Sequence, residues 1–438
     1  MRVFALLGIV LCCAVAAGCA AAGGVEAEQR AAETFVGLAL RLGELAGHER
    51  EVDAYFGPET LRPAAAPDRS GGLAQLRADA DALLSRLELD EDALQTSRGS
   101  KLLTQVRSFD ALLQIIEPAD HKESFAAEAQ RLYALSVPDV DPAATQQLLA
   151  ELELALPGDG PLPRRLAEFY RKFIVPADRR RAMFEQALQE CRRRTLAHWE
   201  LPGAEKLDIE WTTRVPAAWH RYHGGWHSTL QINPDAVALP GSAIDVACHE
   251  AYPGHHAQFL LQDERAQPAG LPVEERVVLL RSPASVLREG AANFGIELAF
   301  PFDERVVFQE RVLFPLAGLD PTQARRYETV HRLVDQLSAA AAPIIASYRD
   351  RRLSRRDAER RLANEALVTS PRALLQFADH YGAYSLGYTA VRDIVRDHVK
   401  ARSRIAGQDD WSVLRELVSD PYGANSPIAH TEAKSPAP

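Results

Sequence analysis

Residues 249–258 read HEAYPGHHAQ, and this stretch decides how the chain is interpreted. A His–Glu pair followed within two helical turns by another His offers two neutral imidazoles to a catalytic zinc ion and a carboxylate, Glu250, as base. The spacing is abnormal, because His255 lies six residues after His249, a rise of about 9 Å on a straight helix. Two nitrogens that share one zinc ion must approach within roughly 3.5 Å of each other. A straight helix cannot bring these two histidines together.

Pro253 and Gly254 offer a change of chain direction between the two histidines. Proline cannot donate the helical hydrogen bond and clashes with the preceding turn, whereas glycine accepts backbone angles closed to other residues. We therefore expect a kink or bulge inside a helix over residues 243–262 that folds His255 back toward the first histidine. The alternative is two helices joined at the proline, with the histidines on the surface. His256 remains an alternative ligand.

The pattern HExxPGHxxQ resembles, at every fixed position, the signature of a large bacterial family of unknown function that is related to gluzincin zinc peptidases. In that family the third metal ligand is a glutamate within a downstream EGWA motif. Residues 288–292 here read REGAA, so alanine replaces the tryptophan at position 291. A YxxGY motif near the C-terminus of the family is matched by residues 384–388.

The resemblance implies a zinc-dependent peptidase that hydrolyses peptide substrates. The implied ligands of the ion, one per chain, are His249, His255 and Glu289, with Glu250 as base and Tyr384 aimed at the substrate. Two neutral imidazoles and one carboxylate leave zinc a net positive charge, so that a bound water can approach a pKa near 7. Glu250 then accepts the proton of the attacking water and returns it to the leaving amine. The Tyr384 hydroxyl can donate a hydrogen bond to the tetrahedral oxyanion.

Other residues are expected around the substrate. Related zinc peptidases hold an extended peptide on the edge strand beside the metal helix, and residues 226–233 are the candidate edge strand here. The predicted substrate-binding residues are Trp226, Ser228, His256, Tyr388 and Arg392.

Three further histidines, His220, His223 and His227, lie in the predicted strand region. Alternation along a strand places His220 and His223 on opposite faces unless a bulge intervenes, so they are interpreted as the wall of a cleft and not as a second metal site. Asp245, one turn before His249, either orients that histidine or is an exposed acidic residue at the start of the helix.

Cysteine usage adds one open question. Cys248 is interpreted as small core packing and not as a metal ligand. Apart from three cysteines at the N-terminus, it has one possible disulfide partner, Cys191.

The N-terminus is predicted to be a signal peptide over residues 1–18. Arg2 supplies the positive charge, residues 3–15 are apolar, and Ala-Ala-Gly-Cys over residues 16–19 resembles a bacterial lipobox. We expect Cys19 to carry lipid, residues 19–30 to form a tether, and the protein to be exported to the cell envelope or periplasm. Membrane contact is then limited to this anchor. Secretion without lipid is the alternative.

Composition is that of a globular protein, with 47% hydrophobic and 25% charged residues among 438. The formal net charge of −10 argues against a nucleic-acid partner, because a phosphate-binding surface needs a basic face. The Arg-rich run over residues 349–361 alternates with acidic residues and is interpreted as a solvated helix face.

The predicted fold is mainly α. A zincin-like, gluzincin-type catalytic lobe over residues 201–420, containing a small antiparallel sheet, packs on a helical N-terminal lobe over residues 31–200, and residues 421–438 are expected to be disordered. Strands are predicted over residues 206–212, 217–223 and 228–232. Helices in the catalytic lobe are predicted over residues 243–262, 283–299, 321–337, 342–366, 384–400 and 411–417.

Two other functions stay open beside the peptidase. One is a catalytically inactive, substrate-binding lipoprotein of the envelope, although a retired site would have no need of Glu250. The other is a zinc hydrolase of a non-peptide amide or ester, because fold and metal do not fix the substrate.

Overall fold

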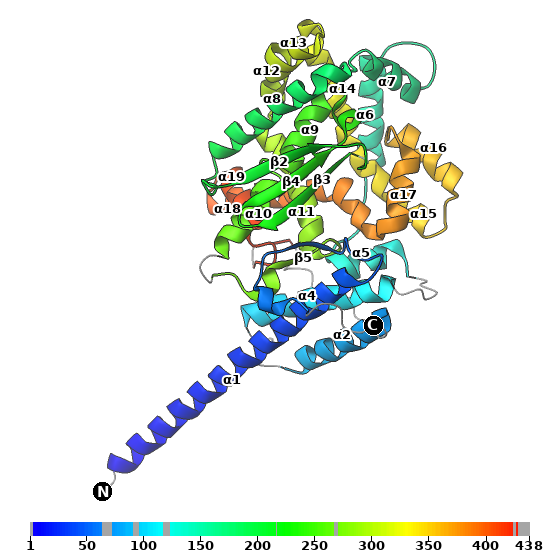
Figure 1. Ribbon diagram of the computed structural model, residues 1–438. Coiled ribbons are helices and arrows are strands. Elements are labelled where there is room, and N and C mark those ends of the chain that lie inside the picture. The colour runs from blue at the N-terminus through cyan, green and yellow to red at the C-terminus, as the bar shows by residue number, and fades with distance from the viewer. Residues whose placement is uncertain are drawn as a thin grey trace. The chain divides into compact units, whose positions relative to one another are not determined.

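A computed structural model describes residues 3–63, 72–90, 96–116, 123–215, 217–266, 270–423 and 426–427, with side chains from residue 24 onward. The chain is mainly helical with two small sheets, and its helices carry the labels used below (Figure 1). It divides into two compact units: Met1–His121 with Leu271–Leu280, and Lys122–Gly270 with Arg281–Pro438.

Among its described residues, the first unit packs three helices around a small core. Phe35 and Phe109 meet edge to face with ring centroids 5.8 Å apart, and both side chains are buried. A two-stranded antiparallel sheet, which the sequence pattern did not reveal, joins β1 to β5 from the inserted segment. The elements are α1 (Val3–Glu44), β1 (Val52–Tyr55), η1 (Glu59–Leu61), α2 (Gly72–Leu89), α4 (Ser97–Ile116), η4 (Val273–Glu275) and β5 (Val277–Leu279).

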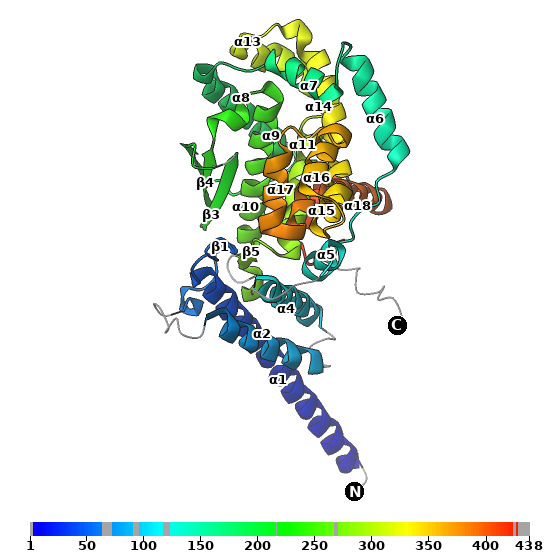
Figure 2. The same cartoon turned by 90° about the vertical axis from the view of Figure 1, so that its right-hand side faces the viewer.

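The second unit contains most of the helices, which surround α9 and α11 (Figure 2). Its helices are α5 (Phe125–Tyr133), α6 (Pro142–Ala155), α7 (Leu162–Arg171), α8 (Ala177–Leu196), α9 (Pro240–Glu250), α10 (His255–Arg265), α11 (Pro283–Ala299), α12 (Phe302–Phe308), α13 (Phe314–Ala317), α14 (Ala324–Gln336), α15 (Ala341–Arg349), α16 (Arg355–Glu365), α17 (Pro371–Tyr381), α18 (Val391–Ala406) and α19 (Asp410–Ser419). Short 3₁₀ helices are η3 (Pro234–Val237), η6 (Pro321–Gln323), η7 (Ser338–Ala340) and η8 (Gly382–Tyr388), and η5 (Gln309–Leu313) is a π-helix.

The sheet of this unit has the order β2–β4–β3, formed by Lys206–Trp211, His227–Ile232 and Ala218–Gly224. β4 pairs antiparallel with β3 and parallel with β2. The expected antiparallel sheet is therefore a mixed one. The prediction that residues 226–233 form an edge strand is wrong, because β4 lies between its two neighbours. β3, which packs against α9 and α10, is the edge strand nearest these helices.

An aromatic cluster fixes the N-terminal end of α9. Phe173 packs on Tyr327 of α14 with ring centroids 5.0 Å apart, and both are buried among Leu side chains of α6 and α7. The Tyr327 hydroxyl accepts a hydrogen bond of 3.1 Å from the backbone N–H of Gly241. Helix α9, which carries His249, is thereby tied to a buried anchor.

Three of the predicted helices are broken. The helix predicted over residues 384–400 forms the end of η8 and then α18 from Val391 onward. Residues 342–366 form α15 and α16, because Arg351 adopts a positive φ of 59° and Ser354 caps the second helix by accepting from the Asp357 N–H. Residues 243–262 form α9 and the start of α10, with the break at residues 251–254.

The units do not divide at residue 200, where the sequence placed the lobe boundary. Helices α5 to α8 belong to the second unit, since α8 packs along α9 and α6 packs on α14. The side chains of the predicted signal peptide and of Cys19 lie outside the described residues, as does most of the predicted tail over residues 421–438.

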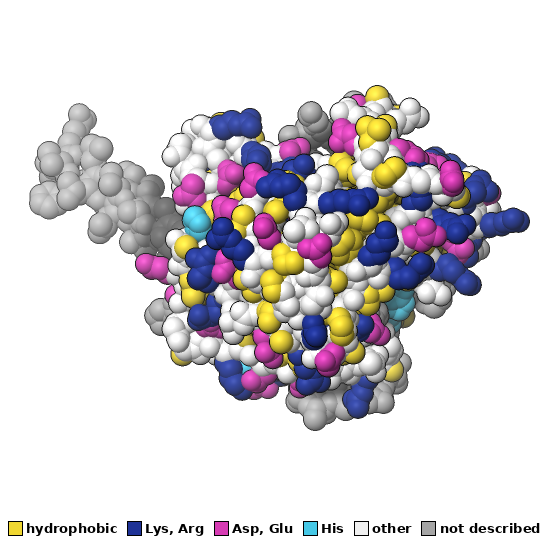
Figure 3. Space-filling view, turned by 90° about the horizontal axis from the view of Figure 1, so that it is seen from above, with side chains coloured by type: hydrophobic (Ala, Val, Ile, Leu, Met, Phe, Trp, Pro, Cys, Tyr) yellow, Lys and Arg dark blue, Asp and Glu magenta, His cyan; other side chains and the backbone are white. Residues whose placement is uncertain are grey.

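Within the described part of the chain, no helix is both long and apolar enough to cross a membrane. On the face shown in Figure 3, Lys and Arg side chains alternate with acidic and apolar ones.

Candidate metal centre

The signature spans two helices and the turn between them. Helix α9 ends at Glu250 and α10 begins at His255. The turn requires glycine at position 254, because a Cβ atom there would lie 1.7 Å from the carbonyl oxygen of His249. The peptide bond before Pro253 is cis. The expected kink is thus a complete break of the helix, and it returns the second histidine to the first.

Helix α11 leaves room for this turn. A Cβ atom at Gly295 would lie 2.7 Å from Cγ of Pro253, so a larger residue would push the turn away. Two more glycines allow close approach of α11 to its neighbours: a Cβ atom at Gly290 would lie 2.6 Å from Val391, and one at Gly387 would lie 3.0 Å from Cβ of Glu289. The glycines of the REGAA and YxxGY stretches therefore serve packing around the site.

Three side chains from three helices converge: His249 from α9, His255 from α10 and Glu289 from α11. Nε2 of His249 lies 3.2 Å from Oε2 of Glu289, and Nε2 of His255 lies 3.6 Å from Oε1. The three ligand atoms lie within 4.8 Å of one another, a spacing that no other group of His, Cys, Asp or Glu reaches among the described residues. Ligands about 2.0–2.1 Å from a tetrahedral zinc ion are about 3.4 Å apart. The residues present fit one such ion.

The electrostatics of the cluster favour a cation. Burial opposes the charged form of His249, but Glu289 and Glu250 outweigh it and raise the pKa of His249 to about 9. Burial also opposes the charged form of Glu289, yet His255 and His249 hold the pKa of this carboxyl well below its usual range. Oε2 of Glu289 is buried and accepts no well-directed hydrogen bond, although Nε2 of His249 lies 3.2 Å away. A divalent cation between these groups would satisfy that oxygen and take the place of the imidazolium charge.

Glu250 lies beside the cluster, close enough for the charges of His249, His255 and Glu289 to act on its carboxyl group. Burial raises the pKa of Glu250 above that of a free carboxyl, against the opposing charges of His249 and His255. A carboxylate with a raised pKa is a better proton acceptor than an ordinary surface glutamate.

His249 is oriented by a residue that the sequence analysis missed. Its Nδ1 lies 3.1 Å from Oδ1 of Asn293, one turn after Glu289 on α11. Neither prediction for Asp245 is correct, because Asp245 is bonded to His331 at 2.9 Å and to Arg305 at 2.8 Å. The spacing of four residues after Glu289 was the signal that could have identified Asn293 as the partner of His249.

The two tyrosines of the YxxGY stretch have different surroundings. Tyr384 is buried and donates a hydrogen bond of 2.8 Å to Oε1 of Glu289, so it holds the candidate ligand and does not face a substrate. Tyr388 is 43% exposed, and its ring centroid lies 6.3 Å from that of His249. The enclosure of its hydroxyl end, with the charges of Glu289 and Glu250, raises the pKa of Tyr388 well above its usual value. Its hydroxyl therefore stays protonated as a donor.

His256 points away from the candidate metal position. It is fully buried, with Nδ1 2.7 Å from Oγ of Ser228 and Nε2 2.9 Å from Oε2 of Glu205. Ser228 is itself fully buried and also lies 2.9 Å from Nε2 of His220. The predictions that Ser228 and His256 contact the substrate are therefore wrong, because both hydrogen-bond inside the protein.

The other two predicted substrate contacts, Arg392 and Trp226, differ in their surroundings. Arg392 is buried and paired with Asp335 and with Glu297, which lies 3.3 Å away, so its guanidinium is already neutralised. Trp226 is partly exposed at the β3–β4 turn in a left-handed conformation with φ of 62°. The substrate contact of Trp226 stays a prediction, whereas the ion pairs of Arg392 contradict the one predicted for it.

The histidines of the sheet do not form a second convergent set. His220 is buried and His223 is exposed, as strand alternation requires. The rings of His223 and His227 are 4.8 Å apart, and His227 bonds Asp208 at 2.8 Å. Burial, followed by the nearby His255 and other histidines, lowers the pKa of His220 well below its usual value, so this imidazole is neutral.

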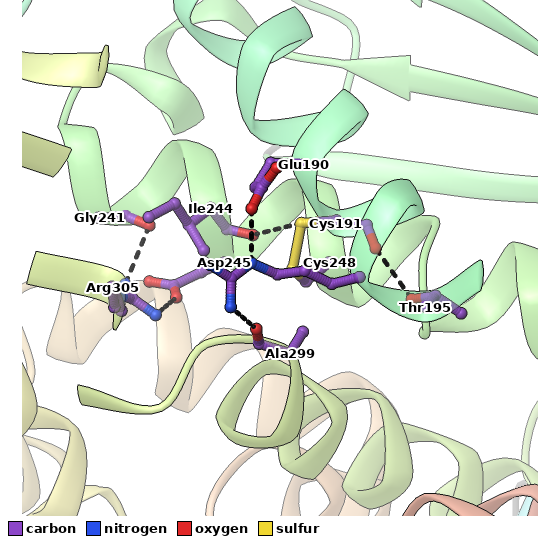
Figure 4. Close-up of a disulfide and its surroundings, with 10 residues drawn as sticks. Glu190, Cys191, Thr195, Gly241, Ile244, Asp245, Cys248, Ala299 and Arg305 are labelled. Atoms are coloured by element: carbon purple, nitrogen blue, oxygen red, sulfur yellow. Dashed lines mark hydrogen bonds and ion pairs between the residues drawn. A yellow bond between two sulfur atoms is a disulfide. The ribbon is translucent and has the colours of Figure 1, made fainter. Parts of the chain in front are cut away.

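A disulfide connects Cys191 of α8 to Cys248, the residue before the ligand candidate His249 (Figure 4). Both cysteines are fully buried. The bridge fixes α9 to α8 next to the ion pair of Arg305 with Asp245. The interpretation of Cys248 as a buried packing residue rather than a ligand agrees with this geometry. The disulfide additionally links Cys248 covalently to Cys191.

Comparison with known proteins shows similarity in fold alone. No known family model matches the chain, and no curated protein matches it. It is similar to the crystal structure of a protein from Colwellia psychrerythraea provisionally assigned as a lipoprotein, with a TM-score of 0.50 and 16% identity. This match covers 83% of the present chain and 66% of that one.

A second solved structure, of a provisionally assigned lipoprotein of unknown function from Shewanella oneidensis, gives a TM-score of 0.46 and 13% identity over 82% of this chain and 72% of that one. The Colwellia structure shows that this fold occurs in a bacterial protein assigned as a lipoprotein.

Proposed function

We propose that the protein is a zinc-dependent peptidase of the bacterial envelope, exported and anchored through lipid on Cys19. The observation that carries the proposal is the convergence of His249, His255 and Glu289 with Glu250 beside them. When bound, zinc would supply a Lewis acid that acidifies water.

The residues around the candidate metal position then have separate roles. Glu250 accepts the proton of the attacking water and delivers it to the leaving amine. Tyr384 keeps the Glu289 carboxylate in place. We assign stabilisation of the oxyanion to Tyr388 in place of Tyr384, because the Tyr388 side chain is exposed next to His249 and its hydroxyl is protonated.

The accessible side of the site is aromatic. Phe377 packs against Tyr388 with ring centroids 5.3 Å apart and against Tyr381 at 4.7 Å, and both Phe377 and Tyr381 are partly exposed. Such a wall suits a bulky apolar side chain of a peptide next to the bond that is cut. The edge of β3 offers backbone groups for an extended peptide chain.

A second candidate function is supported by the fold comparison. The structure from Colwellia is assigned as a lipoprotein without reference to catalysis, which favours a binding lipoprotein that does not hydrolyse its ligand. A zinc hydrolase of a non-peptide amide or ester is the third.

Metal content and turnover separate these functions. The purified protein, without residues 1–18 and with Cys19→Ser, is analysed for zinc and incubated with a mixed peptide library and with simple amide and ester substrates. The peptidase proposal expects one zinc per chain and peptide cleavage that a chelator abolishes. Zinc-free protein without turnover would support the binding lipoprotein, and turnover of esters alone would support the third function.

A further inference from the structure

Glu205 holds both ends of the turn that brings His255 to His249. It lies in the loop before β2, and its side chain is 6% exposed. Oε2 of Glu205 accepts a hydrogen bond of 2.7 Å from the Tyr252 hydroxyl and lies 2.9 Å from Nε2 of His256. Tyr252 and His256 are the residues on either side of Pro253, Gly254 and His255, so one oxygen atom ties both ends of the turn.

The carboxylate of Glu205 is ionised in this setting. Burial alone would raise its pKa, but hydrogen bonds from His256, Tyr252 and Arg192 outweigh burial and lower the pKa of Glu205 to about 2. Nε of Arg192 donates to the other oxygen, Oε1, at 2.9 Å. Because a carboxylate only accepts hydrogen bonds, Nε2 of His256 carries a proton and donates the hydrogen bond to Oε2 of Glu205.

The other side of His256 is fixed to the sheet. Its Nδ1 lies 2.7 Å from Oγ of Ser228 on β4, which in turn lies 2.9 Å from Nε2 of His220 on β3. The imidazole of His256 is therefore held at both nitrogens. The first turn of α10 cannot rotate without breaking one of these bonds.

The side-chain bonds of His256 add to the backbone hydrogen bonds of the turn. Within the turn, the Gly254 N–H donates to the Cys248 carbonyl at 2.9 Å and the Ala257 N–H donates to the Ala251 carbonyl at 3.0 Å. These bonds close the turn, while Gly225 donates to Asp263 and Arg288 donates to Gln262 in the later part of α10. The Glu205 bonds act on the first turn of α10, whose orientation decides whether His255 or His256 faces Glu289.

We propose that Glu205 is a positioning residue of the metal centre, which clasps Tyr252 and His256 so that His255 faces His249 before a cation binds. The proposal rests on the metal site of the proposed function but not on peptide hydrolysis. Partners that orient ligands from outside the coordination shell typically change metal affinity by about 10- to 100-fold when they are removed.

The test compares the variants Glu205→Gln and Glu210→Gln. The Glu210 side chain on β2 accepts a hydrogen bond from Gln231 on the partly exposed side of the sheet, so it serves as the control. Zinc affinity is measured by competition with a chromogenic chelator, and hydrogen–deuterium exchange of the metal-free proteins is followed in peptides covering residues 251–257. We expect Glu205→Gln to lose about 10- to 100-fold in zinc affinity and to exchange faster in this segment only. Glu210→Gln should match the wild type in both.

Tyr252→Phe removes one donor and preserves the ring, so it keeps the proposal testable if Glu205→Gln fails to fold. It should weaken zinc binding by a smaller but measurable factor. Unchanged zinc affinity and unchanged exchange in Glu205→Gln, or in Tyr252→Phe if the first variant does not fold, would overturn the proposal. If the wild type binds no zinc while Glu205→Gln still exchanges faster at residues 251–257, the clasp stands and the proposed metal function fails.

Discussion

Two pairs of histidines in the second unit have nearly the same separation and different surroundings. The rings of His249 and His255 are 4.7 Å apart, and those of His223 and His227 are 4.8 Å apart. Each pair also has a carboxylate next to it, Glu289 in the first case and Asp208 in the second.

The pairs differ in what their nitrogens and carboxylates already bind. Asp208 is bonded to Lys206 as well as to His227, and Nε2 of His223 lies 2.8 Å from Oγ1 of Thr229. In the buried pair, the Nε2 atoms of both histidines lie within 3.2 and 3.6 Å of one buried carboxylate, that of Glu289. Proximity of histidines therefore does not define a candidate metal site. Convergence of buried ligand atoms from three helices does.

The proposed peptidase function predicts its largest effect at Glu250, the carboxylate beside the buried pair. Glu250→Gln preserves volume and removes the basic oxygen, so turnover of peptides should fall by about 100- to 10,000-fold while zinc content is unchanged. Steady-state kinetics and elemental analysis of the same sample measure both quantities. A variant that is metal-bound and fully active, or metal-free, would show that the role of Glu250 is wrongly assigned.

The next effect separates the two pairs by metal binding. His255→Ala removes a ligand and should weaken zinc binding by more than the roughly 100-fold expected for an outer partner. His256→Ala should have an intermediate effect, and His227→Ala none. Chelator competition gives all three affinities. Equal losses in His255→Ala and His227→Ala would remove the distinction between the pairs.

The disulfide next to His249 is expected to stabilise the folded protein. Replacing Cys191 and Cys248 together by Ala should lower the free energy of unfolding by about 2–4 kcal/mol, because the bridge closes a long loop of the unfolded chain. Zinc content should remain at one per chain, since neither sulfur is a ligand. Urea denaturation measures the first quantity, and loss of zinc from the folded variant would contradict the second expectation.

The smallest effect concerns the orientation of single imidazoles. Asn293→Ala removes the partner of Nδ1 of His249 and should weaken zinc binding by about 10- to 100-fold. Thr229→Ala removes the comparable partner of His223 and serves as the matched control. Isothermal titration with zinc should distinguish the two variants, and an equal response would count against orientation of His249 by Asn293.

The sequence alone reveals the residues whose chemistry is local. His249, Glu250 and His255 could be named because a His–Glu pair followed by another His suits a zinc ion, and the Pro-Gly pair indicated that the helix must turn. Glu289 was named from the resemblance of residues 288–292 to the EGWA motif. The limits of α11 were also predicted correctly, since Pro283 begins it and its apolar pattern is regular.

Features that depend on distant contacts could not be predicted. Glu205 and Asn293 are polar residues with no distinctive motif, and their roles depend on which helices lie beside them. The sheet order could not be deduced, because pairing of β2 with β4 joins strands separated by β3 in the chain. Ser228 and Arg392 were misassigned, since sequence gives the polarity of a side chain and not its burial.

The most direct test of the account is a crystal structure of the zinc-loaded protein with anomalous diffraction recorded at the zinc absorption edge. The account predicts one strong anomalous peak per chain, bonded to Nε2 of His249, Nε2 of His255 and the carboxylate of Glu289. Absence of a peak between these three side chains, or a peak of equal strength at His223 and His227, would contradict it.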